Sequence, residues 1–571
     1  MTVYPTINDN DFFEKINKIY SGFKIPKDKE TIDKYCTPRK FKLQLPQEFV
    51  SQFLNPKTPY KGLLVYHRIG AGKTCAAIQI AEKWKKVRKI KVVLPASLKG
   101  NFRTELRSMC GGNSYMTPDE RQKLLNLDPS DPKYMDIIET SDKRIDKYYS
   151  IYSYNKFVEY CRAGEMNLKK TLLIIDEIQN MVSETGTFYT ELKDLIDNSP
   201  NDLRIVLLSA TPMFDKPNEI ALTMNLLRLP KPIPVNRDFE KLFIKKTLRD
   251  NKEYVHTQNM DLFKNYIKGF VSYYRGAPPY TFPEMSVRYV KCEMSDFQYN
   301  AYKSVLKNEE TSISKTALKE MNVNTLPNNF YLGTRFVSNI VFPNMKTDDR
   351  GYNSFEGKHI TKKLEKYSTK FNVIVKKLRK KGKSFIYSSF KELAGLKSLV
   401  RVLEALGYKN YVYHGTGAKR FAIWSGDEQH HVKEEIKEVF NRTDNIYGKK
   451  LKIILGSPSI KEGVSLKAVR YVHVLEPYWN QSRLEQVIGR ASRFCSHKDL
   501  PEEERTVKVY IYIATHKNEA ETVDEYIKKL SAGKNKIIKD FEKAIKEIAV
   551  DCKLNKHANV YEDEEDIECV I

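Results

Sequence analysis

The sequence has no run of about 18 apolar residues, and its first residues show no basic flank followed by an apolar core. A membrane-spanning helix needs the first feature and a secretory signal needs the second. We therefore expect an intracellular protein with no membrane partner. The eight cysteines also include no Cys-x-x-Cys pair. Because zinc ribbons and disulfide frameworks depend on regular cysteine spacing, we expect reduced thiols.

Basic residues exceed acidic ones. The 571 residues include 97 Lys and Arg against 72 Asp and Glu, a formal net charge of +25. Lysine and arginine that neutralise phosphates release counterions and so favour association with a polyanion. This charge indicates a nucleic-acid partner, although a lysine-rich surface can also serve solubility alone.

The hydrophobic pattern divides the chain into five parts. Apolar runs of strand length alternate with amphipathic segments in two blocks, which is typical of parallel sheets covered by helices. Strands are expected at 62–66, 91–95, 150–154, 171–176 and 204–209, and again at 384–387, 409–414, 452–456, 470–475 and 507–513. The predicted parts are an extension (1–40), a first α/β domain (41–230), a linker with a largely helical insertion (231–370), a second α/β domain (371–530) and a helical tail with an acidic end (531–571).

Residues 67–74 read His-Arg-Ile-Gly-Ala-Gly-Lys-Thr and follow the first predicted strand. The two glycines allow a tight turn in which backbone N–H groups face a phosphate. Lys73 can reach the β- and γ-phosphates of ATP, and the Thr74 hydroxyl can ligate Mg²⁺. The full G-x-x-x-x-G-K-[ST] pattern would have glycine at His67, whereas the shorter G-x-G-K-[ST] is intact. The residues predicted to hold the nucleotide are Gly70, Ala71, Gly72, Lys73 and Thr74; the alternative is a glycine turn that binds no nucleotide.

Two acidic residues, Asp176 and Glu177, end the apolar run Leu-Leu-Ile-Ile at 172–175. At the carboxyl edge of a parallel sheet, Asp176 can hold Mg²⁺ while Glu177 orients and deprotonates the attacking water. The next apolar run ends in Ser-Ala-Thr-Pro at 209–212. Its hydroxyl groups can hydrogen-bond to the acidic motif and report the state of the γ-phosphate. Taken alone, each motif can be an ordinary feature: an acidic pair that follows an apolar run by chance, or a polar turn that closes a core strand. Their order along the chain favours the functional interpretation.

The second block contains Gln486, Arg490 and Arg493 in the run Gln-Val-Ile-Gly-Arg-Ala-Ser-Arg. If this run is helical, the two arginines lie on one face, three residues apart. They can then act as fingers that stabilise charge on the γ-phosphate when the two domains close. The alternative is a solvated pair of surface arginines.

This ordered set of motifs, G-x-G-K-T, D-E-x-Q, S-A-T-P and Q-x-x-G-R-x-x-R, resembles the superfamily 2 helicases over about residues 41–513. Trp479 and Asn480 are similar to an element of the Swi/Snf-type DNA translocases. Segments such as Thr58-Pro-Tyr-Lys-Gly and Val472-His-Val-Leu-Glu-Pro-Tyr-Trp-Asn resemble the helicase-like ATPases of poxviruses and giant viruses, namely nucleoside triphosphatase I and the early transcription factor small subunit.

The resemblance implies two tandem RecA-like domains with ATP and Mg²⁺ in the cleft between them. It gives Lys73, Asp176, Glu177, Gln486, Arg490 and Arg493 the catalytic roles described above. It also places Gly463 near the nucleotide and makes Gln47, or else Gln44, the residue that recognises adenine. Residues 95–98, 153–154 and 387–390 would then grip the sugar-phosphate backbone.

The function that follows is a nucleic-acid-dependent ATPase that translocates on DNA in viral transcription, with viral RNA polymerase or transcription factor subunits as partners. The resemblance implies the host cytoplasm as its location, with packaging in the virion as a further one. The alternatives are an ATP-dependent RNA helicase and a low-turnover structural transcription factor on the same scaffold. DNA is favoured over RNA only by Trp479 and Asn480.

Overall fold

The computed structural model describes residues 3–27, 32, 36–37, 41–68, 70–127, 131–182, 186–213, 216–249, 252–312, 331–461, 464–560 and 566–570. The chain forms two compact units. The first contains residues 1–31, 37–279 and 536–571, and the second contains residues 32–36 and 280–535. The chain therefore enters the second unit and returns to the first.

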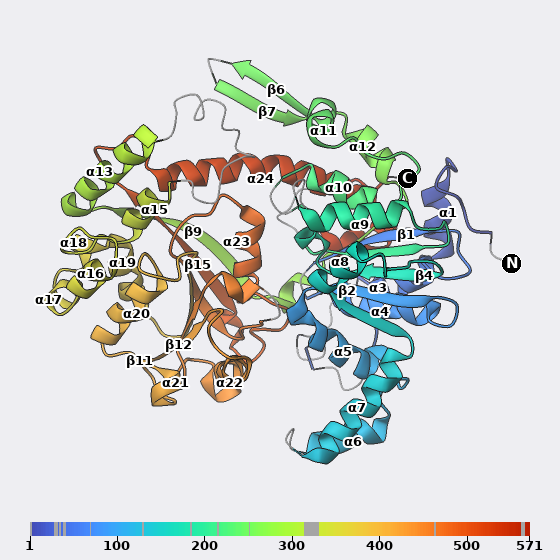
Figure 1. The fold of residues 1–571 in the computed structure, drawn as a ribbon, viewed down its shortest axis with the longest axis horizontal. Helices are drawn as coiled ribbons and strands as arrows, with labels where there is room; N and C mark the ends of the chain where they lie inside the picture. The colour runs from blue at the N-terminus through green and yellow to red at the C-terminus, as the bar shows by residue number, and fades with distance from the viewer. Residues whose placement is uncertain are drawn as a thin grey trace. The chain divides into compact units, whose positions relative to one another are not determined.

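The first unit is built on a six-stranded sheet in the order β3-β2-β4-β5-β1-β8, in which every neighbouring pair is parallel. Figure 1 labels its strands β1, β2 and β4. Its central strands are apolar throughout because helices cover both faces of a parallel sheet, and β1 and β4 are buried along their whole length. The strands are β1 (Gly62–His67), β2 (Lys89–Leu94), β3 (Tyr149–Ser153), β4 (Thr171–Ile175), β5 (Arg204–Leu208) and β8 (Val271–Tyr274).

The predicted strands of the first block all occur within two residues of their expected bounds, and the α/β fold class is confirmed. The strand β8 was not predicted, because four residues between other elements show no period. The helices of this unit are α1 (Phe12–Ile19), α3 (Leu45–Phe53), α4 (Lys73–Trp84), α5 (Lys99–Arg107), α6 (Pro118–Asn126), α7 (Pro132–Asp146), α8 (Tyr154–Arg162), α9 (Thr187–Asp197), α10 (Glu219–Asn225), α11 (Asn236–Phe243), α12 (Met260–Ile267) and α25 (Cys552–Asn559).

The second unit is built on a seven-stranded sheet in the order β11-β12-β13-β10-β14-β15-β9, again parallel throughout. Its strands are β9 (Glu284–Glu293), β10 (Lys383–Tyr387), β11 (Lys409–Asn410), β12 (Arg420–Trp424), β13 (Ile453–Gly456), β14 (Val469–Val474) and β15 (Thr506–Thr515). The helices are α13 (Asp296–Ser312), α15 (Leu332–Asn339), α16 (Asp349–Ser354), α17 (Lys358–Thr361), α18 (Leu364–Tyr367), α19 (Thr369–Lys377), α20 (Leu396–Ala405), α21 (Tyr411–His414), α22 (His430–Asn441) and α23 (Gln481–Ile488).

The strand expected at 409–414 is wrong beyond its first two residues, because the helix α21 starts at Tyr411. The Asn410 side chain accepts a hydrogen bond from Val412 N at 3.0 Å, and Gly415 follows the helix with a φ of 63°. An asparagine cap and a terminal glycine stop a short helix at both ends, a local signal that outweighs the apolar residues between them.

Residues 231–370, expected to be a linker and a helical insertion, contribute strands to both sheets. They contain β8 of the first sheet, β9 of the second, and an antiparallel hairpin formed by β6 (Ile244–Arg249) and β7 (Lys252–Thr257). Most of the polar segment at 309–329 lies outside the described residues. The unit boundary near residue 280 thus falls inside the predicted insertion.

The tail of the chain belongs largely to the first unit. Helix α24 (Val523–Glu547) begins in the second unit and ends in the first, and it starts eight residues before the expected tail boundary at 531. The apolar residues of its amphipathic pattern are buried; Phe541, for example, stacks on Phe239 with ring centroids 5.4 Å apart. Most of the acidic end, 561–565, lies outside the described residues.

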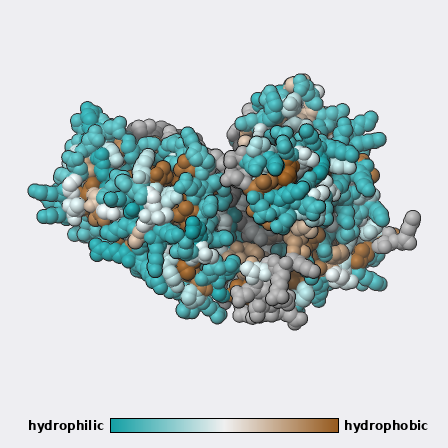
Figure 2. All heavy atoms as spheres, turned by 90° about the horizontal axis from the view of Figure 1, so that it is seen from below, coloured by the Kyte–Doolittle hydropathy of each residue, from teal (hydrophilic) through white to brown (hydrophobic). Residues whose placement is uncertain are grey.

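The described helices include none that combines the length and apolar character needed to cross a bilayer. The face in Figure 2 carries mainly hydrophilic side chains, with small separate hydrophobic areas. The buried apolar side chains lie instead around the two sheets, from Leu63 and Ile174 in the first unit to Ile454 and Val472 in the second.

Candidate active site

The predicted phosphate loop joins β1 to α4 in the first unit. Gly70 and Gly72 have φ values of 88° and 69°, in the region that favours glycine, and α4 begins at Lys73. A Cβ on Gly72 would lie 2.2 Å from Gln47 Nε2. Thr74 is the second residue of α4 and is half-buried. The left-handed glycines and the helix start at Lys73 agree with the expected turn, while phosphate binding stays a prediction.

Lys73 and the acid pair meet at the carboxyl ends of β1 and β4. Lys73 Nζ lies 2.8 Å from Glu177 Oε1 and 3.6 Å from Asp176 Oδ1. Glu177 adopts a φ of 50°, which an L-residue rarely does, and Tyr154 donates its hydroxyl to the Glu177 carbonyl at 2.9 Å and also to the Asp176 carbonyl. Backbone strain of this kind is common at functional sites.

Burial shifts the ionisation of this cluster. Burial raises the pKa of Asp176 to about 6, although the positive charge of Lys73 opposes the shift. Burial lowers the pKa of Lys73, but attraction to Glu177 and Asp176 outweighs it, so the net pKa is raised and the ammonium stays charged. A buried carboxylate with an unfavourable charge is a good ligand for a cation such as Mg²⁺, and its oxygens fit that hard ion.

A hydrogen-bonded chain leads from the acid pair to the Ser-Ala-Thr-Pro motif. Gln179 Nε2 donates to Glu177 Oε2 at 2.6 Å, and Ser209 donates its hydroxyl to Gln179 Oε1 at 2.7 Å. The Thr211 N–H in turn donates to Ser209 Oγ at 3.0 Å. The carboxylate expected to orient water is thus held by the neighbouring motif through Gln179, the last residue of the D-E-x-Q motif, for which no role was predicted.

Gln47 lies against the phosphate loop. Its side-chain nitrogen donates to the Gly72 carbonyl at 3.1 Å, and its oxygen accepts from the Gln44 N–H at 2.9 Å. The side chain is buried. Gln47 therefore braces the loop backbone, while adenine recognition by Gln47 stays a prediction.

His67, in place of the first glycine of the full loop pattern, belongs to a buried polar network. Its Nε2 lies 3.1 Å from Ser272 Oγ, and Ser272 donates to the Asp551 carboxylate at 2.7 Å. Asp551 also accepts from the Tyr273 N–H at 2.9 Å. Burial lowers the pKa of His67 to about 3, so its ring is neutral at physiological pH. The full pattern fails at this position because the side chain is directed into β8.

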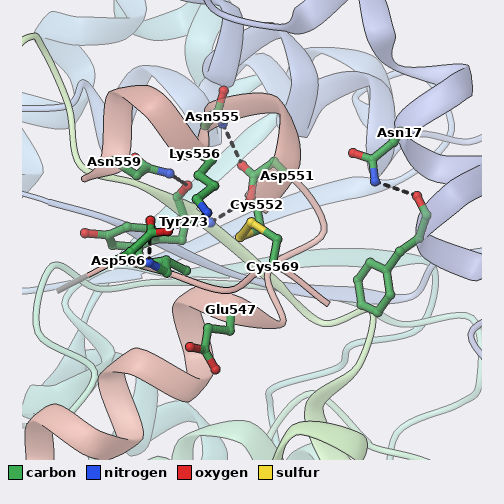
Figure 3. The surroundings of a disulfide bond; sticks show 12 residues. Asn17, Tyr273, Glu547, Asp551, Cys552, Asn555, Lys556, Asn559, Asp566 and Cys569 are labelled. Carbon is green, nitrogen blue, oxygen red and sulfur yellow. Dashed lines mark hydrogen bonds and ion pairs between the residues drawn. A yellow bond between two sulfur atoms is a disulfide. The ribbon is translucent and has the colours of Figure 1, made fainter. Parts of the chain in front are cut away.

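The C-terminal segment and β8 together contact the chain next to the loop, and Figure 3 shows Asn559 of that segment beside Tyr273 of β8. Arg68 N donates to the Tyr274 carbonyl at 3.0 Å, and Asn559 Oδ1 accepts from Arg275 N at 2.8 Å. Asn559 also donates to the Tyr273 carbonyl at 3.2 Å. Nothing in the sequence linked residue 559 to the phosphate loop.

Three disulfides contradict the expectation of reduced thiols. They join Cys36 to Cys495, Cys75 to Cys110 and Cys552 to Cys569, and leave Cys161 and Cys292 free. Their sequence separations are 459, 35 and 17 residues, so no local spacing could reveal them. Cys75 lies directly after Thr74, and Cys552 directly after Asp551 (Figure 3), so two of the three are next to residues of the nucleotide site or its support.

The predicted residues of the second block lie in the second unit. Gln486 is on α23, which ends at Ile488. Arg490 lies in the turn after the helix and Arg493 in an irregular segment, so the expectation that both lie on one helical face is wrong. Arg490 N bonds the Val487 carbonyl at 3.1 Å, and its own carbonyl accepts from Leu466 N at 2.9 Å.

The remaining predicted positions have simple placements. Gly463 lies outside the described residues. Residues 95–98, 153–154 and 387–390 lie at the carboxyl ends of β2, β3 and β10. Their contact with nucleic acid stays a prediction.

Comparison with known families matches both halves of the chain. The SNF2-related domain matches residues 46–340, and the helicase conserved C-terminal domain matches residues 366–495. The first match includes the phosphate loop, the acid pair and the Ser-Ala-Thr-Pro motif, and the second includes Arg490 and Arg493.

Several viral proteins are similar over most of the chain. The protein R563 of Acanthamoeba polyphaga mimivirus, named as an ATP-dependent RNA helicase, is 51% identical over 99% of both chains. The NPH-I homolog of African swine fever virus, named as a termination factor, is 26% identical over 87% of this chain and 77% of its own. The Hef helicase domain of Pyrococcus furiosus matches with a TM-score of 0.43 at 13% identity, over 85% of this chain and 97% of that one, a likeness too weak to add to the sheet topology.

Proposed function

The chain belongs to the SNF2-related helicases and is an ATP-hydrolysing enzyme of that family, and from this premise we propose that it is a Mg²⁺-dependent motor that translocates on DNA. The observation that carries the proposal is the cluster of Lys73, Asp176 and Glu177 at one edge of the first sheet. Bound Mg²⁺ would neutralise phosphate charge and orient the reacting oxygens. A scaffold without turnover has no need for this complete set.

The roles of the residues follow from their positions. Asp176 and Thr74 would hold the metal, and Lys73 would leave Glu177 to contact the phosphates. Glu177, kept in place by Gln179, would then accept the proton of the attacking water. Through the hydrogen bond between Ser209 and Gln179, loss of the γ-phosphate at the site would be transmitted to the Ser-Ala-Thr-Pro motif.

In the second unit, Arg490 and Arg493 would stabilise the charge of the transition state, with Gln486 beside them. Arg493→Ala should then slow hydrolysis while nucleotide binding to the first unit persists. A variant that hydrolyses ATP at the wild-type rate would remove Arg493 from the site.

We further propose that the motor acts in viral transcription in the host cytoplasm, with polymerase or transcription factor subunits as partners, and is packaged in the virion. The name of the swine fever virus relative supports a transcriptional role. The SNF2-related match and Trp479 with Asn480 favour DNA. The second candidate is an RNA helicase, which the name of the mimivirus relative favours.

Steady-state ATP hydrolysis tests the proposal, with Mg²⁺ alone and with single-stranded DNA, duplex DNA or RNA. Glu177→Gln serves as the blank, since it should bind ATP and hydrolyse it far more slowly. Stimulation by DNA and not by RNA is the expected result. Stimulation by RNA alone would favour the helicase candidate, and no turnover above the blank would overturn the motor.

A further inference from the structure

Arg335, on α15 of the second unit, is a buried cation that has no counter-ion among the described residues. Its residue is 4% exposed, and its guanidinium carbon lies 4.8 Å from the ring centroid of Trp479 and 5.2 Å from that of Phe390. In the described part of the chain its side chain makes no hydrogen bond or ion pair. Only Nε is fully enclosed without a partner, so the two terminal nitrogens keep access to solvent.

The two rings come from one edge of the second sheet. Phe390 follows β10 and Trp479 follows β14, and these strands are parallel neighbours, with Tyr387 paired to Val474 at their carboxyl ends. In open parallel sheets, ligands bind outside the carboxyl ends of the strands. Arg335 therefore lies where this fold places ligands.

A polar junction fixes the three segments to one another. The buried Glu476 carboxylate accepts from Ser388 Oγ at 3.0 Å, from Ser389 N, and from Asn339 Nδ2 at 3.3 Å. Asn339 also accepts from Lys370 Nζ at 2.9 Å. The loop after β10, the loop after β14 and α15 thus share one carboxylate, and Arg335 is held in place before any ligand arrives.

Burying a cation costs free energy unless it is paired. The two aromatic rings near the guanidinium offset part of that cost, and its terminal nitrogens stay available for bidentate bonds to a phosphate. The net charge of +25 favours a polyanion over a single small anion.

We propose that Arg335, which lies next to Phe390 and Trp479, binds a phosphate of the nucleic-acid backbone. The inference rests on the proposed function, since it names a binding residue for the same polymer. The contact is to the backbone, so it carries no base specificity.

The test is the affinity for a fluorescent single-stranded oligonucleotide, measured by anisotropy over a range of salt concentrations. Arg335→Met keeps a long apolar side chain next to the rings and removes the charge. We expect affinity about tenfold lower or more, a slope of log affinity against log salt smaller by about 1, and unchanged ATPase activity without nucleic acid.

The matched control is Arg442→Met, which removes the same charge from an arginine already paired with Asp444 at 3.0 Å. It should leave both affinity and salt slope unchanged. Arg335→Lys keeps a positive charge and should fold even if Arg335→Met does not. It should retain the slope with several-fold weaker binding, because lysine makes no bidentate contact.

The outcomes separate the inference from its premise. A wild-type protein that binds no polymer would overturn the proposed function and this inference with it. A wild type that binds, with both Arg335 variants equal to it, would overturn the inference alone. A higher KM for ATP with unchanged polymer affinity would show that Arg335 binds a phosphate of the nucleotide instead of the polymer. An unchanged salt slope in Arg335→Met would show that Arg335 only supports Trp479.

Discussion

Asp176→Asn should make the first unit more stable in the absence of Mg²⁺ while it abolishes ATP hydrolysis. The Asp176 residue is 4% exposed, and burial raises the pKa of its carboxyl to about 6 from an ordinary 3.8, even with Lys73 Nζ 3.6 Å away. The ionised form is thus disfavoured in the folded protein. The asparagine amide is neutral and has the same shape as the carboxylate, so the variant does not bear the free-energy cost of burying a charge.

The magnitude follows from the pKa. One pKa unit corresponds to about 1.4 kcal/mol, so the shift is worth up to about 3 kcal/mol. Because the folded pKa lies above the unfolded one, the folded state binds more protons between the ordinary value and about pH 6. The wild type should lose stability as pH rises through that window and stay at the lower level above it. The gain of the variant should therefore be full at about pH 7 and vanish near pH 4.

Scanning calorimetry with a chelator, at several values of pH, measures this difference. Asp551 is buried in the same unit and burial also raises its pKa to about 6, so the wild-type profile contains both groups and the difference between the proteins isolates Asp176. Mg²⁺ with nucleotide should stabilise the wild type and not the variant. An equal gain at pH 4 and pH 7, or a loss at pH 7, would refute the reasoning.

Three further predictions concern the support of the site. Lys73→Ala should weaken binding of a fluorescent ATP analogue and abolish turnover, and wild-type binding or turnover would contradict the assignment. Gln47→Ala should raise the KM for ATP several-fold because the Gly72 carbonyl loses its donor, whereas Gln52→Ala on the same helix should not. Cys552→Ser should lower the stability of the first unit by roughly 3 kcal/mol by opening a 17-residue loop, measured by calorimetry, with the free Cys161→Ser as a silent control.

The parts of the molecule that depend on local pattern could be predicted from the sequence. The strands β1, β4 and β5 are buried apolar runs bounded by turn residues, and such runs are recognisable alone. The glycines at 70 and 72 predict a left-handed backbone conformation, because few other residues adopt that conformation. The sheet edge that unites Lys73 with Glu177, 104 residues later, follows from strands that must be parallel.

Other features depended on tertiary structure. The end of α23 before Arg490 was missed because a helical spacing of side chains does not report where backbone hydrogen bonding stops. The disulfides were missed because their half-cystines lie up to 459 residues apart. The strand β8 was missed because four residues show no period.

The sequence by itself determined the ATPase chemistry of this protein, since a phosphate loop and an acid pair require particular residue types at particular spacings. Only the tertiary structure decided what surrounds that chemistry. Asp551 reaches His67 through Ser272, and in the second unit Arg335 lies next to Phe390 and Trp479. These contacts join residues that carry no pattern of their own. Burial strengthens the hydrogen bonds and electrostatic contacts of a polar side chain, and burial is decided only by the folded chain.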